Sequence, residues 1–104
     1  MAKYALAYTG GSMSEDEEER RAVMAAWGAW FDSIGDGVVD AGNPFGTSAS
    51  VSADGTVRDG APSELSGYSI ISADSLAEAA DLAKRCPVLH GGGSVEVYEI
   101  VPVM

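Results

Sequence analysis

Residues 65–100 of the chain, LSGYSIISADSLAEAADLAKRCPVLHGGGSVEVYEI, contain the pattern that decides the fold. Their first part, Gly67–Ser72, is rich in residues that favour β-strands. Ser75 followed by Glu78 forms a capping box, and small and apolar residues then recur at helical spacing to about Cys86. The stretch therefore begins with a strand that leads into a helix.

A second strand closes the same stretch. Pro87 ends the predicted helix because proline has no backbone N–H and restricts the residue before it. The glycines Gly91–Gly93 indicate a turn and not a phosphate-binding loop, since a strand follows them where such a loop needs a helix. The final strand is predicted over Ser94–Val101, which gives strand, helix and strand in order.

The first part of the chain repeats that order. Lys3–Thr9 alternates large apolar residues with small or polar ones, which is the period of two expected of a strand. Ser14 and Glu17 form another capping box, which predicts a helix over Glu15–Ile34 with its apolar residues on one face. A short strand, Val38–Ala41, is expected after that helix.

A hairpin is inserted between the two halves. Ser48–Ala53 and Thr56–Arg58 flank Asp54-Gly55, a dipeptide typical of tight hairpin turns. Without the hairpin, the order of elements is strand, helix, strand, strand, helix, strand. The sequence therefore predicts an α+β domain with a ferredoxin-like βαββαβ-type fold and a hairpin insertion. In that topology both helices cover the same face of the sheet.

The face of the predicted sheet without helices is apolar as well. The first and last strands carry apolar side chains on both faces, with Tyr4, Leu6, Tyr8, Val95 and Val97 on one and alanines, Tyr98 and Ile100 on the other. Exposing such a face to water is costly. A second copy of the chain is the simplest cover, so the sequence predicts a homodimer.

The length and charge of the chain limit its function classes. Its 104 residues suit one domain, residues 1–104, and leave no room for a second core. Sixteen Asp and Glu against six Lys and Arg give a formal net charge of -10, the wrong sign for binding a nucleic acid or an anionic membrane. The start of the chain has no apolar run long enough for a signal peptide or a membrane span, which predicts a cytoplasmic protein.

Three conspicuous features favour structural roles. Cys86 is the single cysteine, and without a second cysteine or a nearby base it reads as a packed side chain. The acidic residues 15–19 occupy the first turns of the predicted helix, where they stabilise the helix and radiate outward instead of converging on a metal ion. Trp27 and Trp30 read as core residues. No metal and no cofactor is predicted.

Several short motifs together resemble a known family. In residues 65–100 these are Gly-Tyr before an Ala-Asp-Ser helix start, a Cys-Pro stop and a Gly-Gly-Ser-Val-Glu-Val strand. This stretch looks like the C-terminal half of YCII-related proteins, and residues 27–45, WGAWFDSIGDGVVDAGNPF, support the likeness. The branch called DGPF is named after a motif that here reads Asp59-Gly60-Ala61-Pro62. The resemblance covers roughly the whole chain.

The resemblance implies a dimeric α/β barrel in which two sheets face one another, with a pocket between sheet and loops. Some relatives carry a His and an Asp proposed as a catalytic pair, and one group acts as a chloro-hydroquinone dehydrochlorinase. DGPF-like members are often associated with extracytoplasmic-function sigma factors, so a functional association with a sigma factor is implied. The relatives place their His on the first helix, where this chain has Ala25, Ala26 and Trp27.

His90 is the single histidine and the main candidate for acid–base chemistry near neutral pH. Three glycines follow it and would let a ligand approach closely. The carboxylates predicted to act with it as catalytic residues are Asp40, Asp59 and Glu96. Glu96 is expected on the helix-free face, and the predicted ligand-binding residues are Tyr68, Glu96 and His90. The alternatives are a surface histidine and a Glu96 that is solvated or ion-paired.

Two classes of function remain. The first is a non-catalytic, small-molecule-binding or regulatory dimer, which is favoured because the sequence has no nucleophile–base pair, metal cluster or cofactor fingerprint. The alternative is a small-molecule enzyme with proton-transfer or lyase-type chemistry in a pocket between sheet and loops. A pocket that holds His90 within hydrogen-bond reach of Glu96 would favour the enzyme.

Overall fold

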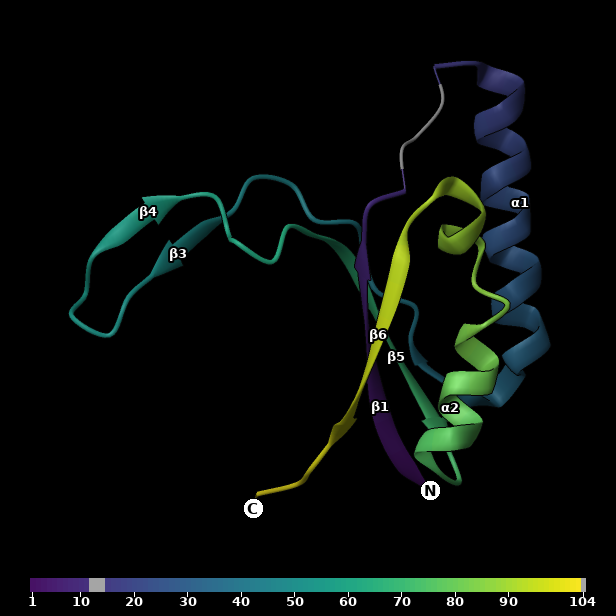
Figure 1. Ribbon diagram of the computed structural model, residues 1–104. Helices are drawn as coiled ribbons and strands as arrows, with labels where there is room; N and C mark the ends of the chain where they lie inside the picture. The colour runs from purple at the N-terminus through teal and green to yellow at the C-terminus, as the bar shows by residue number, and fades with distance from the viewer. Residues whose placement is uncertain (12–14, 104) are drawn as a thin grey trace.

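The computed structural model describes residues 1–11 and 15–103 as an α+β arrangement (Figure 1). In chain order the elements are β1 (Ala2–Thr9), α1 (Glu17–Ile34), the 3-10 helix η1 (Gly35–Gly37), β2 (Val38–Asp40), β3 (Ala49–Val51), β4 (Val57–Asp59), β5 (Leu65–Ala73), α2 (Leu76–Ala83), the 3-10 helix η2 (Pro87–Gly91) and β6 (Ser94–Ile100). No helix within the described ranges is both long and apolar enough to cross a bilayer.

The main sheet has four strands in the order β2-β5-β1-β6, and every neighbouring pair is antiparallel. β1 and β5 are therefore the central strands, as expected for the first and third strands of the predicted topology. β2 and β6 are the edge strands, as expected for its second and fourth strands. Both helices lie on one side of this sheet (Figure 1). The arrangement is compatible with the predicted ferredoxin-like fold, and β3 with β4 forms the predicted hairpin as a separate two-stranded sheet.

Side chains alternate across the central strands, which separates a core face from a helix-free face. On the helix side, Tyr4, Leu6 and Tyr8 of β1 are buried, and the intervening β1 residues are not. We call the opposite side the helix-free face; it carries Lys3, Ala5, Ala7 and Thr9 of β1, Ser66, Tyr68, Ile70 and Ser72 of β5, Ser94, Glu96, Tyr98 and Ile100 of β6, and Asp40 of β2. None of these residues is buried.

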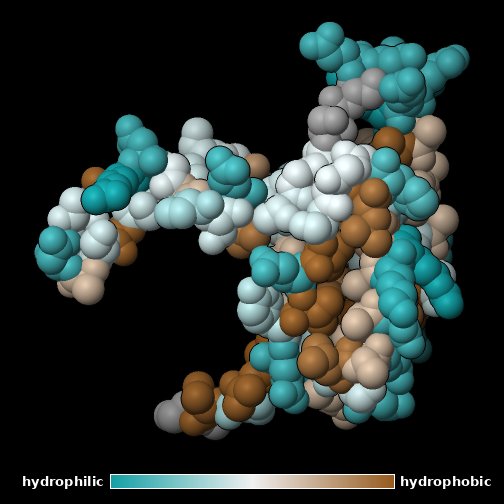
Figure 2. Space-filling model, in the orientation of Figure 1, coloured by the Kyte–Doolittle hydropathy of each residue, from teal (hydrophilic) through white to brown (hydrophobic). Residues whose placement is uncertain are grey.

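The hairpin leaves the body of the protein altogether. We call β3, β4 and the turn between them the arm; it projects from the helix-free side of the sheet, and so do the residues that follow β6 (Figure 1). A hollow lies between the arm, the sheet and these last residues (Figure 2). The radius of gyration is 15.1 Å, whereas a compact domain of this length has about 13 Å. The chain is therefore more extended than a self-contained domain.

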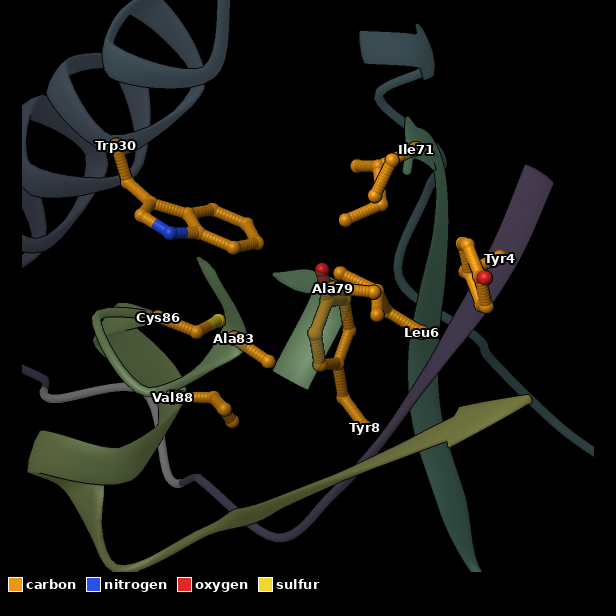
Figure 3. Close-up of a cluster of buried hydrophobic side chains, with 10 residues drawn as sticks. Tyr4, Leu6, Tyr8, Trp30, Ile71, Ala79, Ala83, Cys86 and Val88 are labelled. Atoms are coloured by element: carbon orange, nitrogen blue, oxygen red, sulfur yellow. The ribbon is translucent and has the colours of Figure 1, made fainter. Parts of the chain in front are cut away.

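The core fills the space between the sheet and the two helices (Figure 3). Leu6, Ile71 and Cys86 are fully buried there, so the packed role predicted for the cysteine is confirmed. Trp30 reaches in from α1, and its indole Nε1 donates a hydrogen bond to the carbonyl oxygen of Leu82 at 2.9 Å. This bond ties α1 to the end of α2.

Two helix boundaries differ from the predicted ones. The N-cap of α1 is Asp16, whose carboxylate accepts from the backbone N–H of Glu18 at 2.9 Å; the predicted cap, Ser14, lies outside the described residues. The second helix ends at Ala83 and not near Cys86, because the chain turns there and begins η2 at Pro87. These changes leave the topology as predicted.

Candidate functional site

A cavity of about 610 Å³ lies beneath α1 at one end of the sheet. Five segments form its walls: α1, the end of β1 with the turn after it, the loop after β2, the start of β5, and η2. Its lining consists of Tyr8, Gly10, Gly11, Ala22, Val23, Met24, Ala26, Trp27, Phe31, Ala41, Gly42, Asn43, Pro44, Ser66, Gly67, Tyr68, Ser69, Pro87, Val88, His90 and Gly91. This volume falls within the range of ordinary small-molecule sites.

Aromatic rings form the inner wall of the cavity. Trp27 meets Tyr8 edge to face with centroids 5.2 Å apart, and it packs beside Phe31 at 5.9 Å. Both tryptophans are predicted to be core residues, and that prediction is confirmed for Trp30, which is buried. Trp27 is half-buried because one side of its indole faces the cavity. The helix therefore uses one tryptophan for the core and the other for the cavity wall.

A short hydrogen-bond chain lies where the cavity meets the core. The hydroxyl of Tyr8 donates to Ser69 Oγ at 2.8 Å, and the hydroxyl of Ser69 donates to the carbonyl oxygen of Ala41 at 2.7 Å. Burial raises the pKa of Tyr8 well above its usual value, so the phenol stays protonated at physiological pH. The chain therefore fixes the loop after β2 against β5 and gives the cavity a neutral polar floor.

The cavity wall lacks formal charge apart from one titratable histidine. Among the described residues that line it, none is Asp, Glu, Lys or Arg, although the chain has sixteen acidic residues. Cys86 lies behind this wall, and its burial raises the thiol pKa to about 11, so it is not a thiolate nucleophile at neutral pH. No group of three or more potential metal ligands occurs within the described part of the chain.

His90 lies at the rim of this cavity and is exposed. It belongs to η2, and the turn that follows is pressed against the end of β1. A Cβ atom on Gly93 would come within 2.5 Å of the Thr9 carbonyl oxygen, so only glycine fits there. Across the described ranges, no hydrogen bond or ion pair joins His90 to Asp40, Asp59 or Glu96. Within the described residues, the structure therefore places the histidine at a cavity with no hydrogen bond or ion pair to the three predicted carboxylates.

Of the other predicted residues, Asp40, Tyr68 and Glu96 lie on the helix-free face. Asp40 and Tyr68 meet on the helix-free face, where the Tyr68 hydroxyl donates to the Asp40 carboxylate at 3.2 Å. Ala7 pairs with Tyr68 on one side and with Glu96 on the other, so the three residues form one row on that face. Glu96 is exposed and accepts from the Tyr98 hydroxyl at 3.4 Å. It lies outside the cavity lining, whereas Tyr68 and His90 contribute to the lining.

Asp59 lies at the base of the arm. It ends β4 opposite Ala49, and the Asp59-Gly60-Ala61-Pro62 motif closes the arm onto the strand that opens it. The N–H of Gly60 donates to the carbonyl oxygen of Ser48 and the N–H of Ala61 donates to the Ser48 hydroxyl, each at 2.9 Å. In this chain the motif therefore closes a hairpin and does not line the cavity.

No sequence pattern indicated several of the residues that form the cavity. Gly10 and Gly11 both have positive φ, at 70° and 77°, and turn the chain away from β1 at the cavity. Asn43 and Pro44 lie in the loop after β2. One sequence feature could have pointed to the cavity. Glycine-rich turns follow β1, β2 and η2, and these three elements end at the same end of the sheet.

The family model of the YCII-related domain matches residues 2–104, essentially the full length. A search of the curated proteins found no match.

Proposed function

The chain belongs to the YCII-related domain family, and from that premise we propose that it is a non-catalytic small-molecule-binding protein that acts as a homodimer. The observation that carries the binding proposal is the cavity of about 610 Å³ beneath α1. It combines an aromatic wall with a few polar groups, which is the composition of most small-molecule sites.

The lining favours a neutral compound with an aromatic or other planar apolar part. Trp27, Phe31 and Tyr8 offer ring faces and edges for stacking. Asn43 and His90 are the polar side chains at the rim, and they are suited to orient a hydroxyl or carbonyl group. A strongly charged ligand is disfavoured because the described lining offers no Lys, Arg, Asp or Glu as a counter-charge.

The helix-free face supports the homodimer. Ala5, Ala7 and Ile70 lie at its centre, and Tyr98 and Ile100 are 55% and 38% exposed. A second copy would cover this apolar surface, with two sheets facing one another. This is the dimeric barrel that the resemblance implies, and it remains a proposal.

The enzyme alternative has weaker support. Proton transfer by His90 needs a correctly placed partner or substrate proton within hydrogen-bond reach. Glu96, the predicted partner with the best-defined position, is on the helix-free face and outside the cavity lining. Ligand binding therefore needs no group beyond those that line the cavity, whereas proton transfer by His90 needs a partner as well.

Ligand binding is tested by thermal shift and tryptophan fluorescence with phenol, 4-methylphenol and benzoate as probes. We expect the phenols to raise the unfolding midpoint and to change the emission of Trp27, and benzoate to act more weakly. Ala26→Leu fills the cavity and should weaken phenol binding at least tenfold. Ala29→Leu, on the same helix but outside the lining, and Glu96→Gln are the controls and should bind normally. No shift and no fluorescence change at millimolar phenol would contradict the proposal.

A further inference from the structure

The arm has no core of its own. β3 and β4 have three residues each and pair only with each other. A two-stranded hairpin is marginally stable in water unless its side chains pack against something. Val51 and Val57 lie directly opposite one another in it and are 68% and 66% exposed. The arm therefore presents a pair of β-branched apolar side chains to solvent.

The two faces of the arm differ in character. Side chains alternate along a strand, so Val51 and Val57 share one face with Ala49, and Ser50 and Arg58 share the opposite face. Hydrophobic atoms are visible along the side of the arm that faces the hollow (Figure 2). We call the face with the two valines the valine face of the arm.

The root of the arm is firmly held, so its direction is defined by the body. Pro44 bridges to Gly67 of β5, and the N–H of Phe45 donates to the carbonyl oxygen of Ser66 at 2.9 Å. The Phe45 ring stacks on Tyr68 with centroids 5.6 Å apart and an interplanar angle of 17°. These contacts lie at the edge of the helix-free face, so the arm leaves the body directly beside that surface. An arm that is already oriented loses less entropy when it binds.

The helix-free face alone offers a small area for a stable dimer. Four strands spaced about 4.8 Å apart, over about seven residues at about 3.4 Å each, give a flat area of roughly 450 Å². A stable interface buries about 800 Å² on each partner. The arm and the exposed residues Val101 and Val103 after β6 project from the same side, and together they offer the missing apolar area.

Charge also favours a second copy of this chain on these surfaces. The net charge of -10 opposes self-association through most of the exterior. The helix-free face carries only Lys3, Asp40 and Glu96 as charged residues, and the valine face of the arm adds Asp59. These surfaces are therefore among the least repulsive that two such chains can bring together.

We propose that the arm of each protomer clasps the second copy, laying Val51 and Val57 against the partner while the two helix-free faces meet. This inference rests on the homodimer proposed above and adds that the arm supplies much of the contact between the two protomers. It also gives the Asp59-Gly60-Ala61-Pro62 motif a role, which is to close the base of that arm.

The first test compares two variants that each add one positive charge to the arm. Val57→Lys changes the valine face, and Ser50→Lys changes the opposite face of the same hairpin. Sedimentation equilibrium should show a dimer at least tenfold weaker for Val57→Lys and unchanged for Ser50→Lys. Circular dichroism of both variants should match the wild type, because the arm lies outside the core.

The second test uses a photo-crosslinking benzoylphenylalanine at position 57 or 58. Irradiation should give a covalent dimer from position 57 and little from position 58, which faces away from the partner. The crosslinked peptide should come from the sheet strands, the arm or residues 101–103 of the other chain. Crosslinks to α1 or α2 would overturn the clasp. A wild-type monomer would overturn the homodimer itself, whereas a wild-type dimer unaffected by Val57→Lys would overturn the arm inference alone.

Discussion

At the scale of single residues, the buried thiol of Cys86 links stability to pH. Burial raises its pKa in the folded protein to about 11, against a usual value of 9.0 for the unfolded chain. The folded state therefore binds the thiol proton more tightly than the unfolded chain does. The stabilisation that Cys86 provides is complete below pH 9 and is lost as the pH rises from 9 through 11. Between pH 7.5 and pH 10, the loss of stability attributable to Cys86 is about 1 kcal/mol.

Urea unfolding of the wild type and of Cys86→Ala at those two pH values measures this loss. The alanine variant is expected to be less stable at both, because it leaves a small cavity, but its decrease from pH 7.5 to pH 10 should be smaller by about 1 kcal/mol. Contributions from groups that do not interact with Cys86 cancel in this comparison, whereas that of Tyr8 does not, because Cys86 helps to raise the pKa of Tyr8. Equal decreases in the two proteins would show that the thiol is accessible to water in the folded state.

Single residues also show which features of the candidate site could be predicted from the sequence and which could not. Alternation along the last strand correctly separated Glu96 from Val95 and Val97, since periodicity depends only on backbone geometry. The residues predicted to bind a ligand are Tyr68, Glu96 and His90, and the cavity lining contains Tyr68 and His90 but not Glu96. Alternation cannot reveal such a cavity, because its walls come from α1, η2 and loops as well as from strands. His90 and Tyr68 were identified as site residues, but no pattern indicated the part played by Gly10 or Asn43.

At the scale of elements, the loop that joins β2 to the arm depends on one glycine. Gly42 has a φ of 80°, and a Cβ atom there would lie 1.6 Å from the carbonyl oxygen of Tyr68. Gly42→Ala must therefore push the loop off β5, and we expect it to cost more than about 2 kcal/mol of unfolding free energy. Gly46→Ala is the matched control, because nothing lies within 4 Å of its Cβ position. A urea midpoint for Gly42→Ala equal to that of Gly46→Ala would mean that the loop shifts freely.

The elements themselves were largely predictable, and the reasons are local. The capping box of Ser75 and Glu78 marks the start of α2, and the Ser75 hydroxyl accepts from the Glu78 N–H at 3.1 Å as predicted. The Asp54-Gly55 turn likewise identifies the hairpin. The projection of that hairpin could not be predicted, because it depends on the stacking of Phe45 on Tyr68 and the close approach of Pro44 to Gly67. Both contacts join segments more than twenty residues apart.

At the scale of the whole molecule, shape and charge oppose one another. The extended outline, with its arm and hollow, favours the proposed second copy, while sixteen acidic residues against six basic ones make two copies repel. In α1, Glu17, Glu18 and Glu19 all lie in the first turn, on the side of the sheet away from the hollow. Repulsion between protomers is therefore long-range, whereas the surfaces proposed to touch carry few charged residues.

Such a dimer should become tighter as salt is added. The screening length falls from about 30 Å at about 0.01 M salt to about 8 Å at about 0.15 M, so repulsion between two chains of net charge -10 is largely removed over that interval. Apolar contacts between the helix-free faces and the arms are not weakened by the same change. We expect the dimer dissociation constant, measured by sedimentation equilibrium, to fall at least about tenfold. A dimer that instead loosens with salt would be held by ion pairs, for example between Lys3 of one chain and Glu96 of the other, and the apolar clasp would then be the wrong account of its assembly.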